Sequence, residues 1–186
     1  MNVIAKICLL FLISFPLILK SQSLSFALTT SPNISFDFNT VQEYEAGIAR
    51  FNACVLNIEA VGTEWDLYVG ATTSVAGQWD VTTNYSTSGS LPTVDMVQVK
   101  LRNSNNTSLV AGFFPLQDIL TPTYIIGSSA NDATVACPAA GTNTAGSYLT
   151  SPGCYLFHVD LKITPGFIYR PGLYTLRIDY IIIEDL

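Results

Sequence analysis

The sequence predicts an all-β protein, a single antiparallel β-sandwich that follows a cleaved signal peptide. Three observations predict it. The chain begins with a short apolar segment of the export type, apolar and polar residues alternate in much of the remainder, and turn-forming residues separate the alternating runs. Alternation with a period of two is typical of strands with one buried face. Short strands at this spacing favour two stacked sheets that bury alternate side chains between them.

Residues 1–23 are expected to form the signal peptide. Lys6 precedes an uncharged run over residues 7–19, and the small polar residues 21–23 follow it, which is the layout of a secretory signal. As a helix this run would rise only about 20 Å, less than the roughly 30 Å of a hydrocarbon core. A membrane anchor is therefore less favoured than cleavage after Ser23 or one residue earlier. The mature protein is expected at the cell surface, in the periplasm or outside the cell.

Residues 24–186 are then expected to form one sandwich domain, since this length is normal for a single core. Without Lys6 and Lys20 the domain has 6 basic and 14 acidic residues, a net charge of about −8. Such a surface repels phosphate backbones, and no basic cluster offsets it. The charge therefore excludes nucleic acid as a partner. No membrane span is expected in the mature domain.

Four segments predict strands most clearly, at residues 154–163, 95–102, 65–69 and 173–183. In the first, apolar side chains take every second position, and His158, Asp160 and Lys162 lie between them. In the last, apolar side chains occupy both faces near Ile181 and Ile183. Such a strand needs cover on both faces, so it is either central in its sheet, which we favour, or an edge that something covers.

Shorter alternating runs predict further strands at residues 24–28, 34–38, 55–61, 78–83, 109–114 and 124–126. Turn signals such as Arg170-Pro171-Gly172 separate the runs. Only residues 40–51 suggest a helix, and Gly47 weakens that prediction. Residues 128–147 are rich in small and polar side chains and are expected to form a long loop or hairpin tip.

The cysteines suggest one disulfide. Cys8 leaves with the signal peptide, so three cysteines remain. Cys137 and Cys154 bracket the small-residue loop, and an exported protein can oxidise such a pair. Cys54 is then left over, either as a small buried hydrophobe or as a thiol free for another bond. The usual burial of free cysteine favours the first alternative.

The sequence offers little for catalysis. Its one histidine, His158, lies on the polar side of a predicted strand, so a solvated histidine is favoured over a catalytic base. The pairs Glu64 with Asp66 and Glu184 with Asp185 form no calcium loop and are expected to face solvent. Zinc-binding spacings and a phosphate-binding glycine loop are also missing. We therefore expect no enzyme, and we assign no catalytic, cofactor-binding or metal-binding residue.

Aromatic side chains are the remaining candidates for ligand binding, because sugar rings stack on exposed aromatic faces. Trp65 is in phase with the apolar residues of its strand, which predicts a core position. Trp79 fits either a sheet-end position or a ligand platform. Tyr68 and Tyr85 accompany the tryptophans in sequence, so Trp79, Tyr68 and Tyr85 are the candidate ligand-binding residues.

Two segments resemble exported bacterial surface domains. Residues 63–69, Thr-Glu-Trp-Asp-Leu-Tyr-Val, contain a Trp-x-Leu step inside a predicted strand. Residues 171–180, Pro-Gly-Leu-Tyr-Thr-Leu-Arg-Ile-Asp-Tyr, resemble the closing strand shared by WxL-type surface domains and by pilin-like or spore-coat-type sandwiches. The resemblance implies an Ig-like or pilin-like sandwich on the cell surface, attached to wall polymer or assembled through strands.

These features predict a secreted or cell-surface module with a structural or adhesive role. Its expected partners are other copies of itself or surface proteins, contacted through the terminal strands, and the segment 23–38 could fill a neighbour's groove. The alternative function is a polysaccharide-binding module that uses its exposed aromatic residues. No cofactor is expected for either function.

Overall fold

The computed structural model describes residues 23–30, 33–61, 64–103, 108–110, 112–126 and 156–185. Within these residues the fold is all-β, as predicted, and the paired strands of every sheet are antiparallel. Two short helices complete the described part, α2 (Val41–Ala46) and the 3-10 helix η1 (Val94–Met96). Residues 1–22 of the expected signal peptide lie outside it, as do Cys137 and Cys154 with their predicted disulfide.

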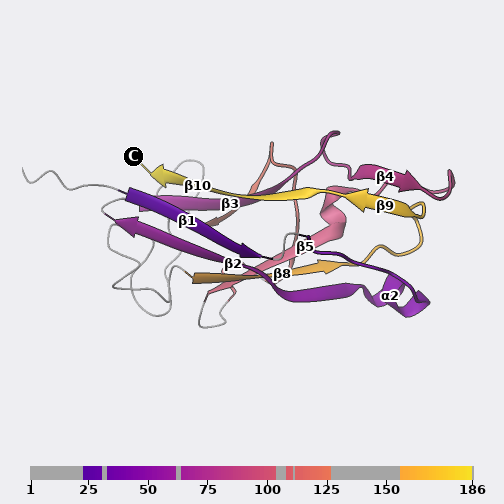
Figure 1. Ribbon diagram of the computed structural model, residues 1–186, viewed down its shortest axis with the longest axis horizontal. Coiled ribbons are helices and arrows are strands. Elements are labelled where there is room, and N and C mark those ends of the chain that lie inside the picture. Colours follow the sequence, from indigo (N-terminus) through magenta and orange to yellow (C-terminus); the bar gives the residue numbers. More distant parts are fainter. Residues whose placement is uncertain are drawn as a thin grey trace, which may run out of the picture.

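The strands form three sheets (Figure 1). The largest has the order β1-β2-β8-β5-β6 and contains β1 (Ser23–Thr30), β2 (Ile48–Val61), β5 (Val97–Asn103), β6 (Phe114–Pro115) and β8 (Leu156–Ile163). The second has the order β10-β3-β7 and contains β3 (Glu64–Thr72), β7 (Thr123–Ile126) and β10 (Arg177–Asp185). The smallest pairs β4 (Asp80–Asn84) with β9 (Gly172–Thr175).

The core lies between the five-stranded and the three-stranded sheet. Alternate side chains of β2, β5, β8 and β3 are buried in it. The rings of Trp65 and Phe157 meet there with centroids 6.2 Å apart, which places β3 opposite β8. The Cys54 thiol donates to the Tyr180 hydroxyl at 3.6 Å, which places β10 opposite β2. The predicted core position of Trp65 and the burial of Cys54 as a free thiol are both confirmed.

Most of the predicted strands are present, with shifted ends. Two of the predicted strands, at residues 34–38 and 109–114, are wrong. Residues 34–38 have the expected alternation, and Ile34, Phe36 and Phe38 pack against the core, but no described strand pairs with them. In the predicted strand 109–114, only Phe114 belongs to a described strand. Alternation therefore predicted the buried face of residues 34–38 correctly, because burial needs only a core, whereas a strand also needs a hydrogen-bonded neighbour.

The predicted helix 40–51 is real but shorter. A capping box starts α2: the Thr40 hydroxyl accepts from the Glu43 N–H at 3.2 Å, and the Glu43 carboxylate accepts from the Thr40 N–H at 2.9 Å. Gly47 ends the helix with a φ of +79°, and a Cβ there would collide with the Thr164 side chain. The next residue, Ile48, begins β2, so the last four residues of the predicted helix, 48–51, are strand.

The C-terminal strand predicted at 173–183 is two strands, interrupted at Leu176. The first part, β9, pairs with β4, and the second part, β10, pairs with β3. The favoured prediction of a central strand is wrong, because β10 is the edge strand of its sheet. The break matches an interruption in the partner segment between Thr72 and Asp80: β10 pairs with β3 before it, and β9 pairs with β4 after it, in a separate sheet.

Candidate functional site

The N-terminal strand β1 is an edge strand that contributes little to the core. All 8 of its residues pair with β2. Leu24, Phe26 and Leu28 lie opposite buried residues of β2, so they are on the core-facing side of the sheet. Phe26 and Leu28 are nevertheless 41% and 43% exposed. The strand also contains no charged residue and no proline, which are the usual protections of an edge strand.

The exposure of β1 follows from the unequal width of the two sheets. Because β10 lies opposite β2, and β1 is the next strand beyond β2, the described part of the three-stranded sheet does not reach over β1. The outer edge of β10 pairs with no described strand. We call β1 and the free edge of β10 together the terminal step. It combines uncovered apolar side chains with two unpaired strand edges.

The opposite end of the molecule also exposes apolar side chains. Figure 1 shows β4, β9 and α2 at one end of the long axis, while β1 begins and β10 ends at the other. We call this end the apolar tip and define it by the exposed side chains of β4, β9 and the loops beside them, namely Val81, Tyr85, Phe167, Ile168 and Leu173. The Phe167 ring stacks on Tyr44 of α2 with centroids 5.5 Å apart. Exposed apolar groups at one end are typical of a contact surface.

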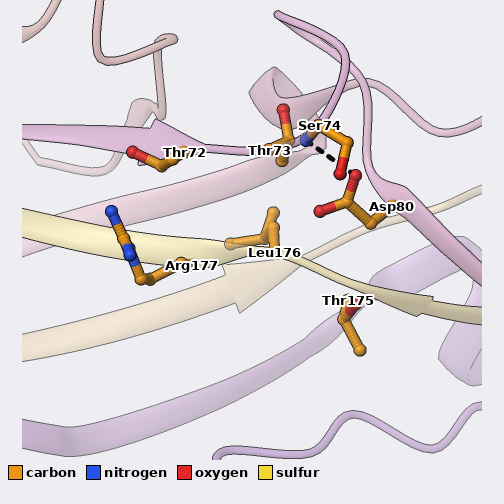
Figure 2. Close-up of a pocket in the computed structure, with 7 residues that line it drawn as sticks. All are labelled: Thr72, Thr73, Ser74, Asp80, Thr175, Leu176 and Arg177. Atoms are coloured by element: carbon orange, nitrogen blue, oxygen red, sulfur yellow. Dashed lines mark hydrogen bonds between the residues drawn. The ribbon is translucent and has the colours of Figure 1, made fainter.

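An open groove of about 460 Å³ lies where the ladder between β3 and β10 ends. Figure 2 shows its lining, which comprises Thr72, Thr73, Ser74, Asp80, Thr175, Leu176 and Arg177. The Asp80 carboxylate accepts from the Ser74 N–H at 2.8 Å. Arg177 Nε lies 2.9 Å from a carboxylate oxygen of Asp179. The groove therefore offers hydroxyl groups, a carboxylate and a guanidinium group to a polar ligand.

Trp79, for which the sequence left a sheet-end position and a ligand platform open, makes contacts with the framework. The Trp79 indole N–H donates to the Thr93 carbonyl oxygen at 3.0 Å, and the half-buried ring packs against the core. The loop that leads to it is held by Asp118, whose carboxylate accepts from the Gly77 N–H at 2.9 Å. Of the two alternatives for Trp79, the sheet-end position therefore describes its contacts.

The three predicted ligand-binding aromatics do not share one surface feature. Tyr68 is half-buried on β3, where its ring meets Tyr124 of β7 with centroids 5.1 Å apart. Tyr85 is 66% exposed and follows β4 at the apolar tip. None of the three lines the groove in Figure 2. Tyr85 alone has the exposure that stacking on a sugar ring requires.

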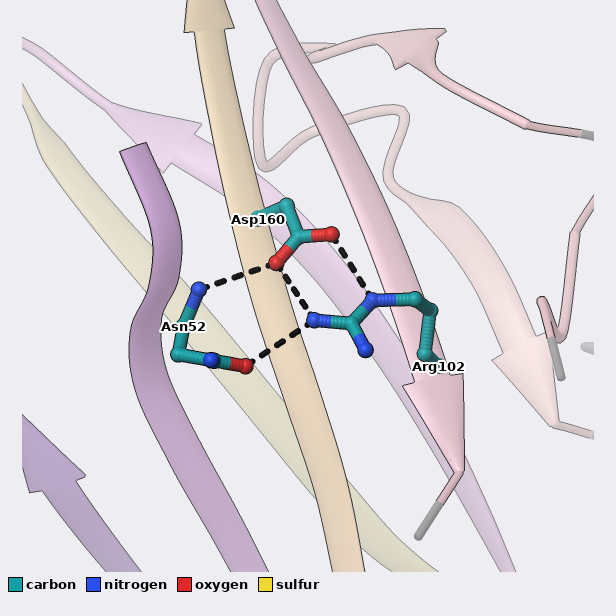
Figure 3. A network of polar contacts seen from close by, with 3 residues as sticks. All are labelled: Asn52, Arg102 and Asp160. Carbon is teal, nitrogen blue, oxygen red and sulfur yellow. Dashed lines mark hydrogen bonds and ion pairs between the residues drawn. The ribbon is translucent and has the colours of Figure 1, made fainter. Parts of the chain in front are cut away.

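A buried ion pair on the outer face of the five-stranded sheet was not predicted from the sequence. Figure 3 shows Arg102 of β5 against Asp160 of β8, with Nη2 and Oδ1 2.7 Å apart. Asn52 completes the cluster: its N–H donates to Asp160 at 2.9 Å, and its side-chain oxygen accepts from Arg102 at 2.9 Å. Asn52 has a φ of +51° at the bulge of β2. The cluster thus ties the bulge to two neighbouring strands.

The cluster has a clear effect on ionisation. Burial of Asp160 opposes its charged form, but hydrogen bonds from Arg102 and the Asn52 N–H, with the charges of Arg102 and Lys100, outweigh burial and lower the pKa of Asp160. In the core, burial raises the pKa of Cys54, and the bond to Tyr180 only partly opposes this. The thiol therefore stays protonated, which makes Cys54 a packing residue rather than a nucleophile.

The other titratable candidates show no catalytic arrangement within the described residues. His158 lies on the outer face of β8, as predicted, but it is half-buried rather than solvated, and its Nδ1 has no hydrogen-bond partner there. Asp66, expected to face solvent, is 3% exposed. In the described part of the chain, no group of three or more His, Cys, Asp or Glu side chains could hold a metal ion. No described helix is long and apolar enough to cross a membrane.

Comparison with known protein families gives no match for the chain. No curated protein matches it significantly either. Functional inference therefore rests on the residues themselves. The terminal step and the Asp160 cluster are the features that sequence reasoning missed. The uncharged run over residues 23–30 could have indicated the terminal step. The Asp160 cluster depends on a bulge that places Asn52 beside two strands, and no local sequence pattern reveals such a bulge.

Proposed function

We propose that this chain is an exported structural or adhesive β-sandwich module that associates with copies of itself through its terminal strands. The observation that carries the proposal is the terminal step, where Phe26 and Leu28 are exposed on the core-facing side of an unprotected edge strand. An open apolar edge recruits further strands. Two such edges, those of β1 and β10, lie on the same side of the molecule.

Two contacts support the sandwich. The Trp65 and Phe157 rings join the two sheets across the core. The Tyr174 hydroxyl donates to the Arg170 carbonyl oxygen at 2.8 Å, four residues earlier. This resembles the tyrosine corner of Ig-like sandwiches, in which a tyrosine bonds to the backbone a few residues upstream. Together these two contacts favour the Ig-like or pilin-like sandwich that the resemblance of residues 171–180 implies.

The positions of the two ends support display at a surface. The first described strand begins and the last one ends at the same end of the long axis, away from the apolar tip (Figure 1). A module attached near either end of the described chain would present the tip outward. The apolar side chains of the tip, of which Ile168 is 67% exposed, then meet the partner.

Cell fractionation, protease shaving of intact cells and sizing of the released native protein test this proposal together. Export and self-association predict a cell-surface or released protein that is larger than one chain on sedimentation. A chain retained in the cytoplasm would contradict export. A monomer at every concentration would contradict assembly through the terminal strands, whatever its location.

Polysaccharide binding is the second candidate, and the groove favours it. Sugars are recognised by hydroxyl, carboxylate and guanidinium groups, which line the groove, and Tyr85 offers an exposed ring elsewhere. Asp80→Asn and Arg177→Gln remove groove charges, whereas Trp79→Ala would also remove framework contacts. Loss of glycan retention in the groove variants supports this function. Retention equal to that of the wild type counts against the groove, and loss in Tyr85→Ala would move the site to the tip.

A further inference from the structure

We propose that two copies of this chain join by a lap joint at the terminal step, with β1 of each copy pairing along the free edge of β10 in the other. This inference rests on the self-association proposed above and specifies its geometry. It follows from the shape of the edge: among the described strands, the five-stranded sheet extends one strand beyond the three-stranded sheet. A surface with one protruding layer and one recessed layer is complementary to the same surface of a second copy rotated by 180°.

The symmetry that achieves this is a two-fold axis parallel to the strands, midway between the two sheets. Rotation about it places the five-stranded sheet of one copy in the layer of the other copy's three-stranded sheet. The β1 strand of the partner then fills the recessed position beside β10. Such an isologous contact closes on itself and gives a dimer.

Strand direction permits the pairing. Figure 1 shows β1 and β10 running in opposite directions along the long axis. A rotation about an axis parallel to the strands preserves the direction of β1, so the partner's β1 runs antiparallel to β10. Antiparallel pairing is how every described sheet in this chain is built. The β1 edge and the β10 edge of both copies would be paired at once.

Apolar burial distinguishes the lap joint from simple edge-to-edge pairing of two β1 strands. Edge-to-edge pairing would extend the sheet but leave the core-facing sides of Phe26 and Leu28 without an opposite layer. In the lap joint, the two β1 strands lie in opposite layers with these sides facing each other. The rotation does not shift residues along the axis. Phe26 of one copy therefore faces Phe26 of the other, and Leu28 faces Leu28.

Charge also favours β1 with β10 over β10 with itself. The β1 strand has no charged residue, whereas β10 carries Asp179, Glu184 and Asp185 against the single cation Arg177. Two β10 strands side by side would join two strands that each carry three acidic side chains and one basic one, in a chain whose net charge is −6. A neutral strand beside β10 avoids that repulsion.

Cysteine cross-linking of the exported full chain tests the geometry. Leu28→Cys places thiols on the facing sides of the two β1 strands, and Ala27→Cys places them on the outer side one residue away. With a short bis-maleimide, the lap joint predicts covalent dimers for Leu28→Cys, at least fivefold more than for Ala27→Cys. Edge-to-edge pairing of β1 predicts dimers for Ala27→Cys as well, and that result would overturn the proposal.

Sedimentation of charged variants gives an independent test. Phe26→Lys places two cations face to face in the joint and is expected to convert dimers into monomers. Its far-UV spectrum, and its urea midpoint at low protein concentration where the wild type is also monomeric, are expected to stay close to those of the wild type. Ala27→Lys, the matched control, is expected to remain dimeric. If the wild type associates but Phe26→Lys does not dissociate it, the lap joint is wrong and self-association stands. If the wild type is monomeric throughout, both proposals fail.

Discussion

The two edges of the five-stranded sheet differ in almost every property that controls strand pairing. The β6 edge is 2 residues long and contains Pro115, and the next residue, Leu116, is fully buried in the core. The β1 edge is 8 residues long, carries no proline or charge, and leaves its apolar side chains exposed. Natural sheets protect edges with short strands and proline. One edge of this sheet therefore has the usual protections, and the other has none of them.

The largest expected effect contrasts the two edges in stability. Leu116→Ala removes a buried side chain beside β6 and is expected to lower the free energy of unfolding by about 2–5 kcal/mol. Leu28→Ala removes a side chain of β1 that is 43% exposed, so a loss of less than about 1 kcal/mol is expected in the monomer. Urea unfolding at low protein concentration measures both. Equal losses would show that β1 is as much a part of the core as β6.

The second prediction concerns the bulge that ends the β1 pairing. The ladder between β1 and β2 stops at Cys54, and Asn52 lies two residues away, in the bulge between Arg50 and Cys54. Asp160→Asn weakens the hydrogen bond from the Asn52 N–H and leaves Arg102 without its charge partner. The free energy of unfolding is expected to fall by about 1.5–3 kcal/mol. Urea unfolding measures the loss. Lys162→Gln on the same face of β8 is the control, and an equal effect there would contradict a specific role for the cluster.

The dependence on pH has the same origin. Because the folded-state pKa of Asp160 is lower than its ordinary value of 3.8, the stability it contributes is present above that value and is lost as the pH falls through the folded-state pKa. Urea midpoints at pH 7 and pH 3 are expected to differ more for the wild type than for Asp160→Asn. If the urea midpoint falls equally in the two proteins between pH 7 and pH 3, other carboxylates cause the acid sensitivity.

The smallest effect is expected at the β6 edge. Pro115 has no N–H, and a proline in an edge strand turns that missing donor outward. Pro115→Thr restores the donor and is expected to change the stability by no more than about 0.5 kcal/mol. Sedimentation is expected to show additional association beyond that of the wild type. Unchanged association would mean that the shortness of β6, rather than its proline, closes the edge.

Alternation predicted much of this fold, because it reports which side chains face a core. It identified the inward side of β8 and the core position of Trp65. It could not predict pairing partners, so the strand at residues 34–38 was wrong, and β10 was assigned to a sheet centre. The apolar Ile181 and Ile183 suggested burial on two sides, whereas Ile183 is 40% exposed at an edge. Neighbours in a sheet are set by long-range topology, which no local pattern contains.

The candidate site was predictable only in part. The sequence indicated terminal strands as contact elements, and it selected Tyr85, which is exposed, as a ligand candidate. Trp79 was undetermined because its indole partner, the Thr93 carbonyl, lies 14 residues away. The Asp160 cluster joins residues separated by 58 and 108 positions. Contacts of that kind appear only when the register of several strands is known.

The location of the apolar tip at one end of the long axis has a consequence for binding strength. A two-fold axis parallel to the strands leaves both copies pointing the same way, so the proposed dimer carries two tips side by side at one end. A target with repeated sites would then be held by both tips, and the second contact would form at a high effective concentration. A surface too small for tight binding by one copy can in this way give durable attachment through avidity.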